Sequence, residues 1–390
     1  MPIPGSRFFI GLMSGTSVDA VDAALVRLHH SKQGLETLSS VSVQFPSELR
    51  QSIQTLQAPS TGELELAARA GLQLAQIYAK AAQQAVTDAG LSARDVTALG
   101  AHGQTVRHRP GEGFTLQLLN AAWLAEATGI PVVYDLRPAD IAAGGQGAPL
   151  VPAFHAHVFA DQAECRAIVN IGGIANISVL PASSQDGTAQ VLGHDTGPGN
   201  TLLDQWHERH RGQRFDPGGA WAAGGTVDGE LLAAMLDDPY FRRLPPKSTG
   251  RDDFNLEWLD DHLRAHAITR GSSRNSAPVA PRDVQATLSE LTATTIALAC
   301  RQTSASQVFL CGGGVYNIDL VRRIARNLPQ CRVASTEEAG LHPMAVEAAA
   351  FAWLAARRVD SLPGNLPAVT GASGGRVLGS IADPWGRLRS

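Results

Sequence analysis

The stretch GLMSGTSVDAVDAALV, from Gly11 to Val26, joins two apolar segments through a turn of small polar residues. The segment 8–12 leads into the turn, and the segment 20–26 leads out of it. Apolar runs on both sides of a Gly/Ser/Thr turn predict the two strands of a hairpin. The N–H groups and hydroxyls of such a turn can converge on an anion, although most turns of this composition close ordinary hairpins and bind nothing.

This turn lacks the signatures of two common phosphate loops. No lysine follows Gly15, so the Walker pattern is absent, and the dinucleotide-binding fingerprint is not matched. A phosphate site in this turn therefore has to belong to a different architecture.

The order of elements along the chain predicts two similar halves. After the opening hairpin, helical spacing over 61–89 and 121–128 alternates with apolar segments at 96–101 and 131–134. From residue 166 the order restarts, with helices expected over 283–301 and 318–328. We predict an α/β fold of two domains with mixed sheets flanked by helices and a cleft between the domains. The first domain is expected to comprise 1–160 plus about 359–390, and the second 161–358.

Composition argues for small-molecule partners. The 390 residues include 44% hydrophobic and 17% charged residues, and the net charge is −4. This balance gives no broad basic surface for nucleic acid or for a membrane. No apolar run approaches the length of a membrane span and no signal peptide is recognisable, so we expect a cytoplasmic protein. The four cysteines lie far apart, so neither a zinc site nor a disulfide framework is predicted.

Two further glycine-rich turns strengthen the case for phosphate binding. NIGGIAN (170–176) and CGGG (311–314) each follow an apolar segment, as the first turn does. Backbone donors from two domains can hold a triphosphate, and glycine lets the backbone approach it closely. The three turns together predict a nucleotide-binding protein.

Two aspartates admit more than one interpretation. Asp195 lies at the end of an apolar segment, where it can act as a general base or simply form the turn and cap the next helix. Asp19 can hold Mg²⁺ through water or only supply polarity to the hairpin.

A polar cluster in the first half suits recognition of a polyhydroxylated, charged small molecule. HGQTVRHRP (102–110) and DLRPADIAAGGQGAPL (135–150) place histidine, glutamine, arginine and aspartate beside glycine-rich turns. An arginine there can bind a carboxylate through two hydrogen bonds. The alternative is that these are charged loops exposed to solvent.

Taken in order, these stretches resemble the anhydro-N-acetylmuramic acid kinases, which belong to the superfamily of actin, sugar kinases and chaperone ATPases. The resemblance covers nearly the whole chain and also includes PPKSTGRDDFN (245–255) and EAAAFAWLA (347–355). It implies two actin-like (ribonuclease H-like) domains, ATP and Mg²⁺ as cofactors, and often a homodimer. The implied reaction opens 1,6-anhydro-N-acetylmuramic acid with water and phosphorylates O6, giving N-acetylmuramic acid 6-phosphate and ADP in peptidoglycan recycling.

The resemblance also assigns residue roles by motif position. Asp195 would deprotonate the attacking water, and Glu347 would lie near the reacting sugar, although a glutamate in an alanine-rich helix is often a surface residue. The resemblance does not single out the arginine that binds the lactyl carboxylate, and we choose Arg137. His102, Gln104, Asp140 and Gly197 are expected as further sugar contacts. The residues expected to bind the nucleotide are Ser14, Gly15, Thr16, Ser17, Val18, Asp19, Ala20, Val21, Asn170, Gly172, Gly173, Asn176, Gly312, Gly313 and Gly314.

One departure and two alternatives stay open. The first phosphate loop of the wider superfamily usually has an aspartate before its glycines, whereas here Asp19 follows the turn, which leaves the magnesium ligand undecided. One alternative is an ATP-gated, chaperone-like binding module of the same fold. The other is a kinase whose acceptor is a plain sugar hydroxyl, which Asp195 would deprotonate directly.

Overall fold

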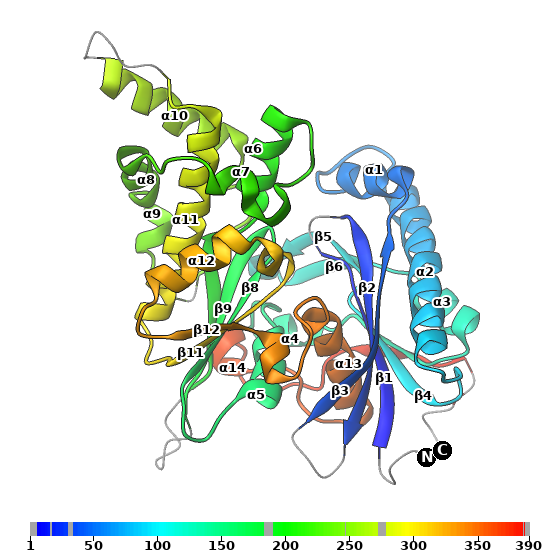
Figure 1. Cartoon of the computed structure of the whole chain (residues 1–390). Helices are drawn as coiled ribbons and strands as arrows, with labels where there is room; N and C mark the ends of the chain where they lie inside the picture. The colour runs from blue at the N-terminus through cyan, green and yellow to red at the C-terminus, as the bar shows by residue number, and fades with distance from the viewer. Residues whose placement is uncertain are drawn as a thin grey trace. The chain divides into compact units, whose positions relative to one another are not determined.

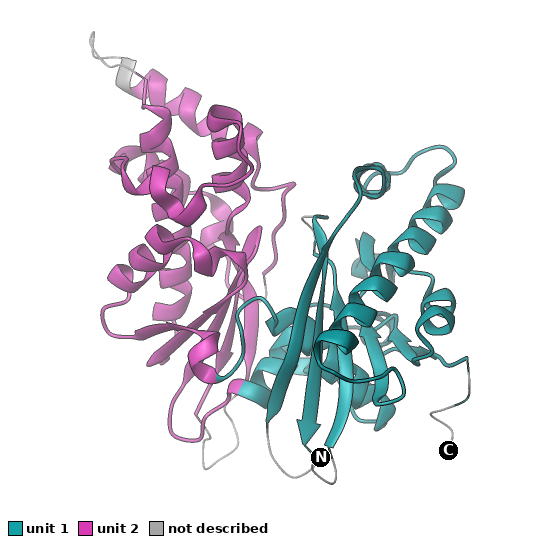
Figure 2. Ribbon diagram, turned by 45° about the vertical axis from the view of Figure 1, so that its right-hand side comes forward, with its two compact units in different colours: residues 1–158, 340–390 teal, residues 159–339 magenta. Residues whose placement is uncertain are grey.

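The computed structural model of the chain forms two compact units, which Figure 2 colours separately. Unit 1 comprises 1–158 and 340–390, and unit 2 comprises 159–339. The structure describes residues 6–15, 18–29, 34–182, 190–245, 247–271, 278–384 and 386. Each unit is built on a mixed β-sheet with helices, which confirms the predicted α/β class.

The sheet of unit 1 grows from the opening hairpin. Its strands are β1 (Ser6–Met13), β2 (Ala20–His29), β3 (Leu35–Gln44), β4 (Val96–Ala101), β7 (Val132–Tyr134) and β13 (Ser380–Ala382), in the order β13-β7-β4-β1-β2-β3. β1, β2 and β3 are antiparallel neighbours, while β4 and β7 join in parallel. A separate hairpin pairs β5 (Gln104–Arg109) with β6 (Phe114–Leu118).

Two long helices cover opposite faces of this sheet (Figure 1). Alternate strand residues such as Ile10 and Leu12 pack with Leu74 and Tyr78 of α2 (Glu63–Asp88) in one apolar core. The other face receives α13 (Val346–Val359). The shorter helices of unit 1 are α1 (Ser47–Thr55), η1 (Pro110–Glu112), α3 (Ala121–Thr128), α4 (Pro138–Ala142), α5 (Val151–Phe159) and α14 (Pro367–Thr370).

Two glycines that pair across β1 and β4 let α13 pack directly on the sheet. A Cβ added to Gly11 would lie 1.7 Å from the carbonyl oxygen of Ala348, and one added to Gly100 would lie 2.0 Å from that of Phe351. The helix backbone therefore takes the space of the missing side chains. This packing corrects the predicted domain boundary, because residues 340–358 belong to unit 1 and not to the second domain.

The sheet of unit 2 repeats the strand order of unit 1. Its strands are β8 (Arg166–Ile171), β9 (Ile174–Leu180), β10 (Leu192–Pro198), β11 (Gln307–Cys311) and β12 (Arg332–Ser335), in the order β10-β9-β8-β11-β12. β8, β9 and β10 are antiparallel, and β11 and β12 join in parallel, as β1 to β3 and then β4 and β7 do. The predicted repetition of the first half is thus present in the topology.

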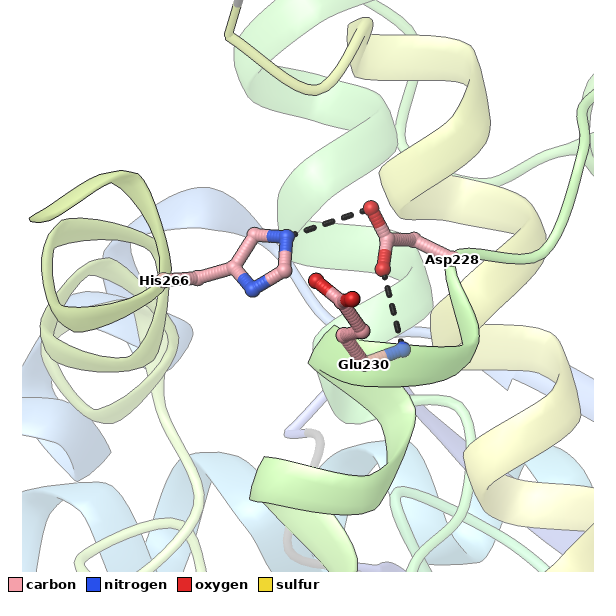
Figure 3. Close-up of side chains that lie close together, drawn as sticks. All are labelled: Asp228, Glu230 and His266. Carbon is pink, nitrogen blue, oxygen red and sulfur yellow. Dashed lines mark hydrogen bonds and ion pairs between the residues drawn. The ribbon is translucent and has the colours of Figure 1, made fainter. Parts of the chain in front are cut away.

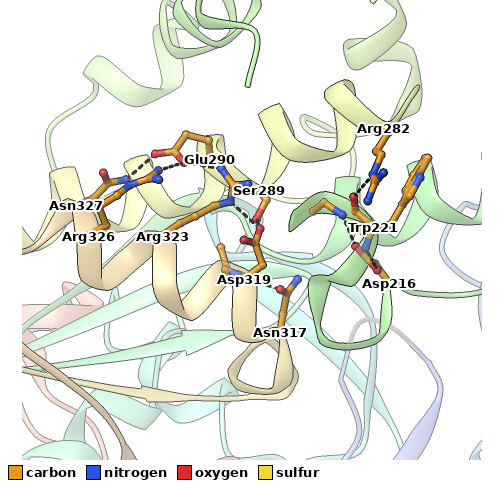
Figure 4. Close-up of polar contacts among 12 residues, drawn as sticks. Asp216, Trp221, Arg282, Ser289, Glu290, Asn317, Asp319, Arg323, Arg326 and Asn327 are labelled. Carbon is orange, nitrogen blue, oxygen red and sulfur yellow. Dashed lines mark hydrogen bonds and ion pairs between the residues drawn. The ribbon is translucent and has the colours of Figure 1, made fainter. Parts of the chain in front are cut away.

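The helices of unit 2 are fixed to one another by polar contacts as well as by apolar packing. They are α6 (Thr201–Arg211), η2 (Pro217–Gly219), α7 (Ala220–Ala223), α8 (Gly229–Leu236), α9 (Pro239–Arg242), α10 (Leu256–Gly271), α11 (Pro281–Arg301), η3 (Gly313–Tyr316), α12 (Ile318–Asn327) and η4 (Thr336–Ala339). Arg323 of α12 binds Glu290 of α11 at 2.9 Å and Asp319 at 2.7 Å (Figure 4). The buried Arg323–Glu290 pair holds α12, which follows the third glycine-rich turn, against α11, while the Asp319 pair lies within α12.

Two expectations about the whole chain can be compared with the structure. The four cysteines form no disulfide. Within the described ranges, no helix is long and apolar enough to cross a membrane.

Candidate active site

The first glycine-rich turn lies between β1 and β2 in unit 1. The hydroxyl of Ser14 is buried, donates to the carbonyl of Gly103 at 3.1 Å, and lies 2.9 Å from the hydroxyl of Tyr78. Val18 closes the turn by donating its N–H to the carbonyl of Gly15 at 3.2 Å, with a left-handed φ of 55°. The Ser14 hydroxyl therefore anchors the turn internally.

The other predicted residues of this turn differ in their surroundings. Ala20 and Val21 begin β2, and Val21 is fully buried. Asp19 is 37% exposed, and its carboxylate lies 3.5 Å from the guanidinium of Arg50. Thr16 and Ser17 lie outside the described residues.

The second turn, Gly172 and Gly173, joins β8 to β9 in unit 2 and is held by the start of α6. The carbonyl of Gly172 accepts from the N–H of Asn200 at 2.8 Å. The carbonyl of Gly173 accepts from the N–H groups of Gly199 and Thr201 at 2.9 and 3.1 Å. Because the N–H groups of residues 199–201 bind both carbonyls, the conformation of the turn is fixed.

Three predicted residues lie side by side beyond this turn. Asn170, Asn176 and Asp195 pair directly across β8, β9 and β10, so their side chains share one face of the sheet. The side-chain oxygen of Asn170 is buried and accepts no hydrogen bond from the described residues. We call these three residues the unit 2 row.

The third turn, Gly312 to Gly314, follows β11 and approaches the same row. Cys311 pairs with Asn170, and a Cβ on Gly312 would lie 2.3 Å from the Asn170 side-chain oxygen. Gly312 has a φ of 79°, so glycine is required both for the backbone conformation and for this close approach. Two of the three predicted phosphate turns therefore meet Asp195 at one end of a single sheet.

One segment of unit 2 fixes the carboxyl group of Asp195. A side-chain oxygen accepts from the N–H of Thr249 at 3.0 Å, and the main chain of Asp195 binds the carbonyl of Lys247 and the hydroxyl of Tyr240. Burial raises the pKa of Asp195 to about 6, and the Thr249 N–H opposes that rise. A carboxylate with a pKa near neutrality is suited to general-base catalysis. Gly197, two residues on, has a φ of 145°.

In unit 1, Arg137, which is partly buried, is paired with His102, which is buried. The Nη2 of Arg137 donates to the Nε2 of His102 at 2.8 Å, and its Nη1 donates to the carbonyl of Gly147 at 2.8 Å. Burial, with repulsion from Arg137, lowers the pKa of His102 to about 3, so its ring is neutral. Because Nε2 accepts from arginine, Nδ1 carries the proton. Gln104 donates to the carbonyl of Gly15 at 3.3 Å and so links this cluster to the first turn.

Asp140 occupies a supporting position, which differs from the predicted sugar contact. It is completely buried, and its carboxylate accepts from the side chains of Asn365 and Thr370 at 2.6 and 2.7 Å. It also accepts from the N–H of Gly147 at 2.7 Å, and Gly147 in turn binds Arg137. Asp140 therefore positions the loop that holds Arg137.

Glu347 lies in the first turn of α13 and is partly buried, which argues against the surface alternative. Burial and repulsion from Asp22 raise the pKa of Glu347 to about 7, while Arg137 opposes the rise. Asp22 lies in β2, paired with Met13 and Ser42, and its own pKa is raised by burial. Asp22 is not among the site residues expected from the sequence, because only the packing of α13 brings Glu347 towards it.

A second acidic cluster, shown in Figure 3, is accounted for by hydrogen bonding. Asp228 caps α8 by accepting from the N–H groups of Glu230 and Leu231, and it lies 3.2 Å from the Nε2 of His266. Ligand atoms of Asp228, Glu230 and His266 lie within 4.8 Å of one another. Since the cap and the histidine occupy the Asp228 carboxylate, we assign this cluster a structural role.

Comparison with known proteins gives matches over nearly the full length. The family model described as anhydro-N-acetylmuramic acid kinase matches residues 7–384. A protein of that name from Variovorax paradoxus is 50% identical over 381 residues, covering 96% of this chain and 98% of the relative. One from Burkholderia thailandensis is 49% identical over 388 residues, covering 97% and 98%. Among solved structures, the activator of 2-hydroxyisocaproyl-CoA dehydratase from Clostridium difficile, with bound ADPNP, aligns at a TM-score of 0.44 and 13% identity, covering 91% of this chain and 97% of that one.

Proposed function

The chain belongs to the anhydro-N-acetylmuramic acid kinase family, and from this premise we propose that it phosphorylates 1,6-anhydro-N-acetylmuramic acid with ATP. Water opens the anhydro ring in the same reaction. The products are N-acetylmuramic acid 6-phosphate and ADP, and the reaction belongs to peptidoglycan recycling. A cytoplasmic location and a homodimer are part of the same proposal.

Asp195 acts on water because the acceptor oxygen has no proton. In the anhydro sugar, O6 is an ether oxygen bonded to C1. Asp195 takes a proton from water, the water oxygen bonds to C1, and the C1–O6 bond breaks. O6 bonds to the terminal phosphorus of ATP, and ADP leaves with the electrons of the broken P–O bond. In an inverting glycosidase a general acid protonates the leaving oxygen. Here the electrophilic phosphorus stabilises the leaving O6 instead, by bonding to it.

The observation that carries this proposal is the unit 2 row beside two glycine turns. Asn176 is paired with Asp195, Asn170 lies on the next strand, and the turns 172–173 and 312–314 lie at the same end of the sheet. Asp195 is mostly ionised at pH 7, since its pKa is about 6, and it is still basic enough to accept a proton.

The unit 1 cluster supplies the sugar contacts of the proposal. Arg137 stays protonated, because its pKa falls only to about 10 on burial, and it binds the lactyl carboxylate. His102 fixes the orientation of Arg137, Gln104 and Gly197 contact the sugar, and Glu347 orients the water or stabilises charge at C1. The nucleotide binds the backbone of the turn 14–21 and the turns 170–176 and 312–314.

Mg²⁺ fits beside the first turn. The ion needs only one or two carboxylates together with phosphate oxygens, and it keeps several waters. Asp19 meets that requirement, since it is partly exposed and follows the turn directly. Asp19 would hold Mg²⁺ through water, and the bound ion would neutralise negative charge on the phosphates.

A coupled ADP-release assay tests the proposed reaction. The acceptors are 1,6-anhydro-N-acetylmuramic acid, N-acetylmuramic acid and N-acetylglucosamine, and we expect turnover with the anhydro sugar alone. Equal turnover with N-acetylmuramic acid would instead support a kinase for a plain hydroxyl. No turnover with any sugar, together with ATP-dependent capture of a protein, would support the chaperone-like module.

A further inference from the structure

We propose that Arg251 is a catalytic residue that contacts the terminal phosphoryl group of ATP through its guanidinium group. This inference rests on the proposed function, because it assumes that the Gly172–Gly173 turn binds the phosphates. Arg251 lies in the turn 250–254, between the segment that holds Asp195 and the helix α10.

The position of Arg251 is defined by its approach to the second glycine turn. A Cβ added to Gly173 would lie 3.7 Å from the Nη2 and 3.9 Å from the Nε of Arg251. At Gly172, the nearest atom to an added Cβ is the carbonyl oxygen of Ile174, at 3.4 Å. The guanidinium group therefore borders a turn that is otherwise loosely surrounded on its outer side.

The charge of Arg251 has no protein counterpart in the described part of the chain. Its guanidinium group forms no hydrogen bond or ion pair with a described residue. The nearby carboxylate of Asp253 accepts instead from the hydroxyl of Thr249, at 2.7 Å. By contrast, Arg209, Arg242 and Arg264 of the same unit are each paired with an aspartate.

An unpaired arginine beside backbone N–H groups of a glycine turn is suited to a phosphate. The planar guanidinium group presents two parallel N–H donors, which match two oxygens of one phosphoryl group. In phosphoryl transfer, charge spreads over the equatorial oxygens of the transferred group, and donors placed there stabilise the transition state.

The same segment fixes Arg251 and Asp195, which identifies the phosphoryl group concerned. Thr249 binds the Asp195 carboxylate through its N–H, and the turn after it is closed by the N–H groups of Asp253 and Phe254 on the carbonyl of Gly250. Phe254 is buried and stacks on Phe241 at 5.5 Å, which anchors the far end of the turn. Because Asp195 acts at the reacting sugar, the phosphoryl group close to its segment is the terminal one, which is transferred to O6.

The test compares Arg251→Ala and Arg251→Lys with Arg264→Ala in the full-length protein. Arg264 is an exposed arginine of α10 paired with Asp261, so it is a matched control. We expect Arg251→Ala to lower kcat by about 10²–10³-fold, as loss of one transition-state donor does. Arg251→Lys should recover part of the rate, because lysine keeps the positive charge but lacks the two parallel N–H donors of the guanidinium group. Thermal unfolding confirms that each variant is folded.

Two further readouts separate a phosphoryl contact from a structural role. Arg251→Ala should weaken binding of a non-hydrolysable ATP analogue at least tenfold relative to ADP binding, and millimolar guanidinium should restore part of its activity. If the wild-type enzyme is active and Arg251→Ala has the same kcat, the inference is wrong. Equal weakening of analogue and ADP binding would also overturn it. If the wild-type protein does not turn over the anhydro sugar, the proposed function fails, while the binding ratio still tests Arg251.

Discussion

Each sheet carries a row of three paired residues across its three antiparallel strands, and the two rows place their acidic groups differently. In unit 1 the row is Met13, Asp22 and Ser42 across β1, β2 and β3. In unit 2 it is Asn170, Asn176 and Asp195 across β8, β9 and β10. The carboxylate lies on the middle strand of the first row and on the edge strand of the second.

This difference determines what controls each acid. The edge position lets the segment 247–249 bind both the backbone and the carboxylate of Asp195. Asp22 is covered by α13, whose Glu347 adds a second acid, while Arg137 adds a positive charge. Hydrogen bonds thus hold the acid of unit 2, whereas in unit 1 burial raises the pKa of both acids and nearby charges modify that of Glu347.

Unit 1 should be destabilised by a substitution that prevents α13 from packing directly on its sheet. Gly11→Ala places a methyl group where the Ala348 carbonyl lies, so we expect a loss of at least about 3 kcal/mol in the free energy of unfolding. Denaturant unfolding measures it, with Gly111→Ala as the control because a Cβ at Gly111 meets no atom within 4 Å. A Gly11→Ala variant as stable as the control would contradict the direct packing of α13.

The variant Glu347→Gln tests how strongly the surroundings of Glu347 shift its pKa. The pKa of Glu347 is about 7 in the folded chain and ordinarily 4.5, so the folded state favours the protonated form. Stability from this group is present below pH 4.5 and is lost as the pH rises through 7. Glutamine avoids that loss, so the variant should be more stable than wild type at pH 8, by on the order of 1–3 kcal/mol.

The same measurement at pH 5 provides the control for this variant. At pH 5 the difference in the free energy of unfolding between Glu347→Gln and wild type should shrink to about a quarter of its value at pH 8. The folded Glu347 is protonated at pH 5, so wild type loses only the smaller free energy needed to protonate this group on folding. Thermal unfolding at both pH values gives the comparison. A difference that does not change with pH would mean that the ionisation of Glu347 is not perturbed by its surroundings.

The sequence predicted those parts of the structure that depend on local patterns. Apolar runs around a glycine turn predicted the hairpin β1–β2, whereas Asp195, expected at the end of an apolar segment, lies inside β10. The sequence could not predict that Asp140 is buried by Asn365 and Thr370, because these partners lie more than 200 positions away. The predicted domain boundary was wrong because residues 340–358 pack on the sheet of unit 1, whose strands lie far away in the sequence.

Helical periodicity identified α13 but not the sheet it packs on. That choice is made by Gly11 and Gly100, two small residues separated by 89 positions that pair only in the folded sheet. The sequence analysis gave Arg251 no role, because only folding brings it to Gly173.

The most direct test of the account is the rate of ADP release by Asp195→Asn with 1,6-anhydro-N-acetylmuramic acid, measured across pH. Asparagine keeps an oxygen for the Thr249 N–H but cannot accept a proton from water. We predict that turnover falls by roughly 10²-fold or more, and that the loss of rate expected below pH 6 for the wild-type enzyme is absent from the variant. Near-normal turnover, with the wild-type decline below pH 6 intact, would contradict the assignment of Asp195 as the base.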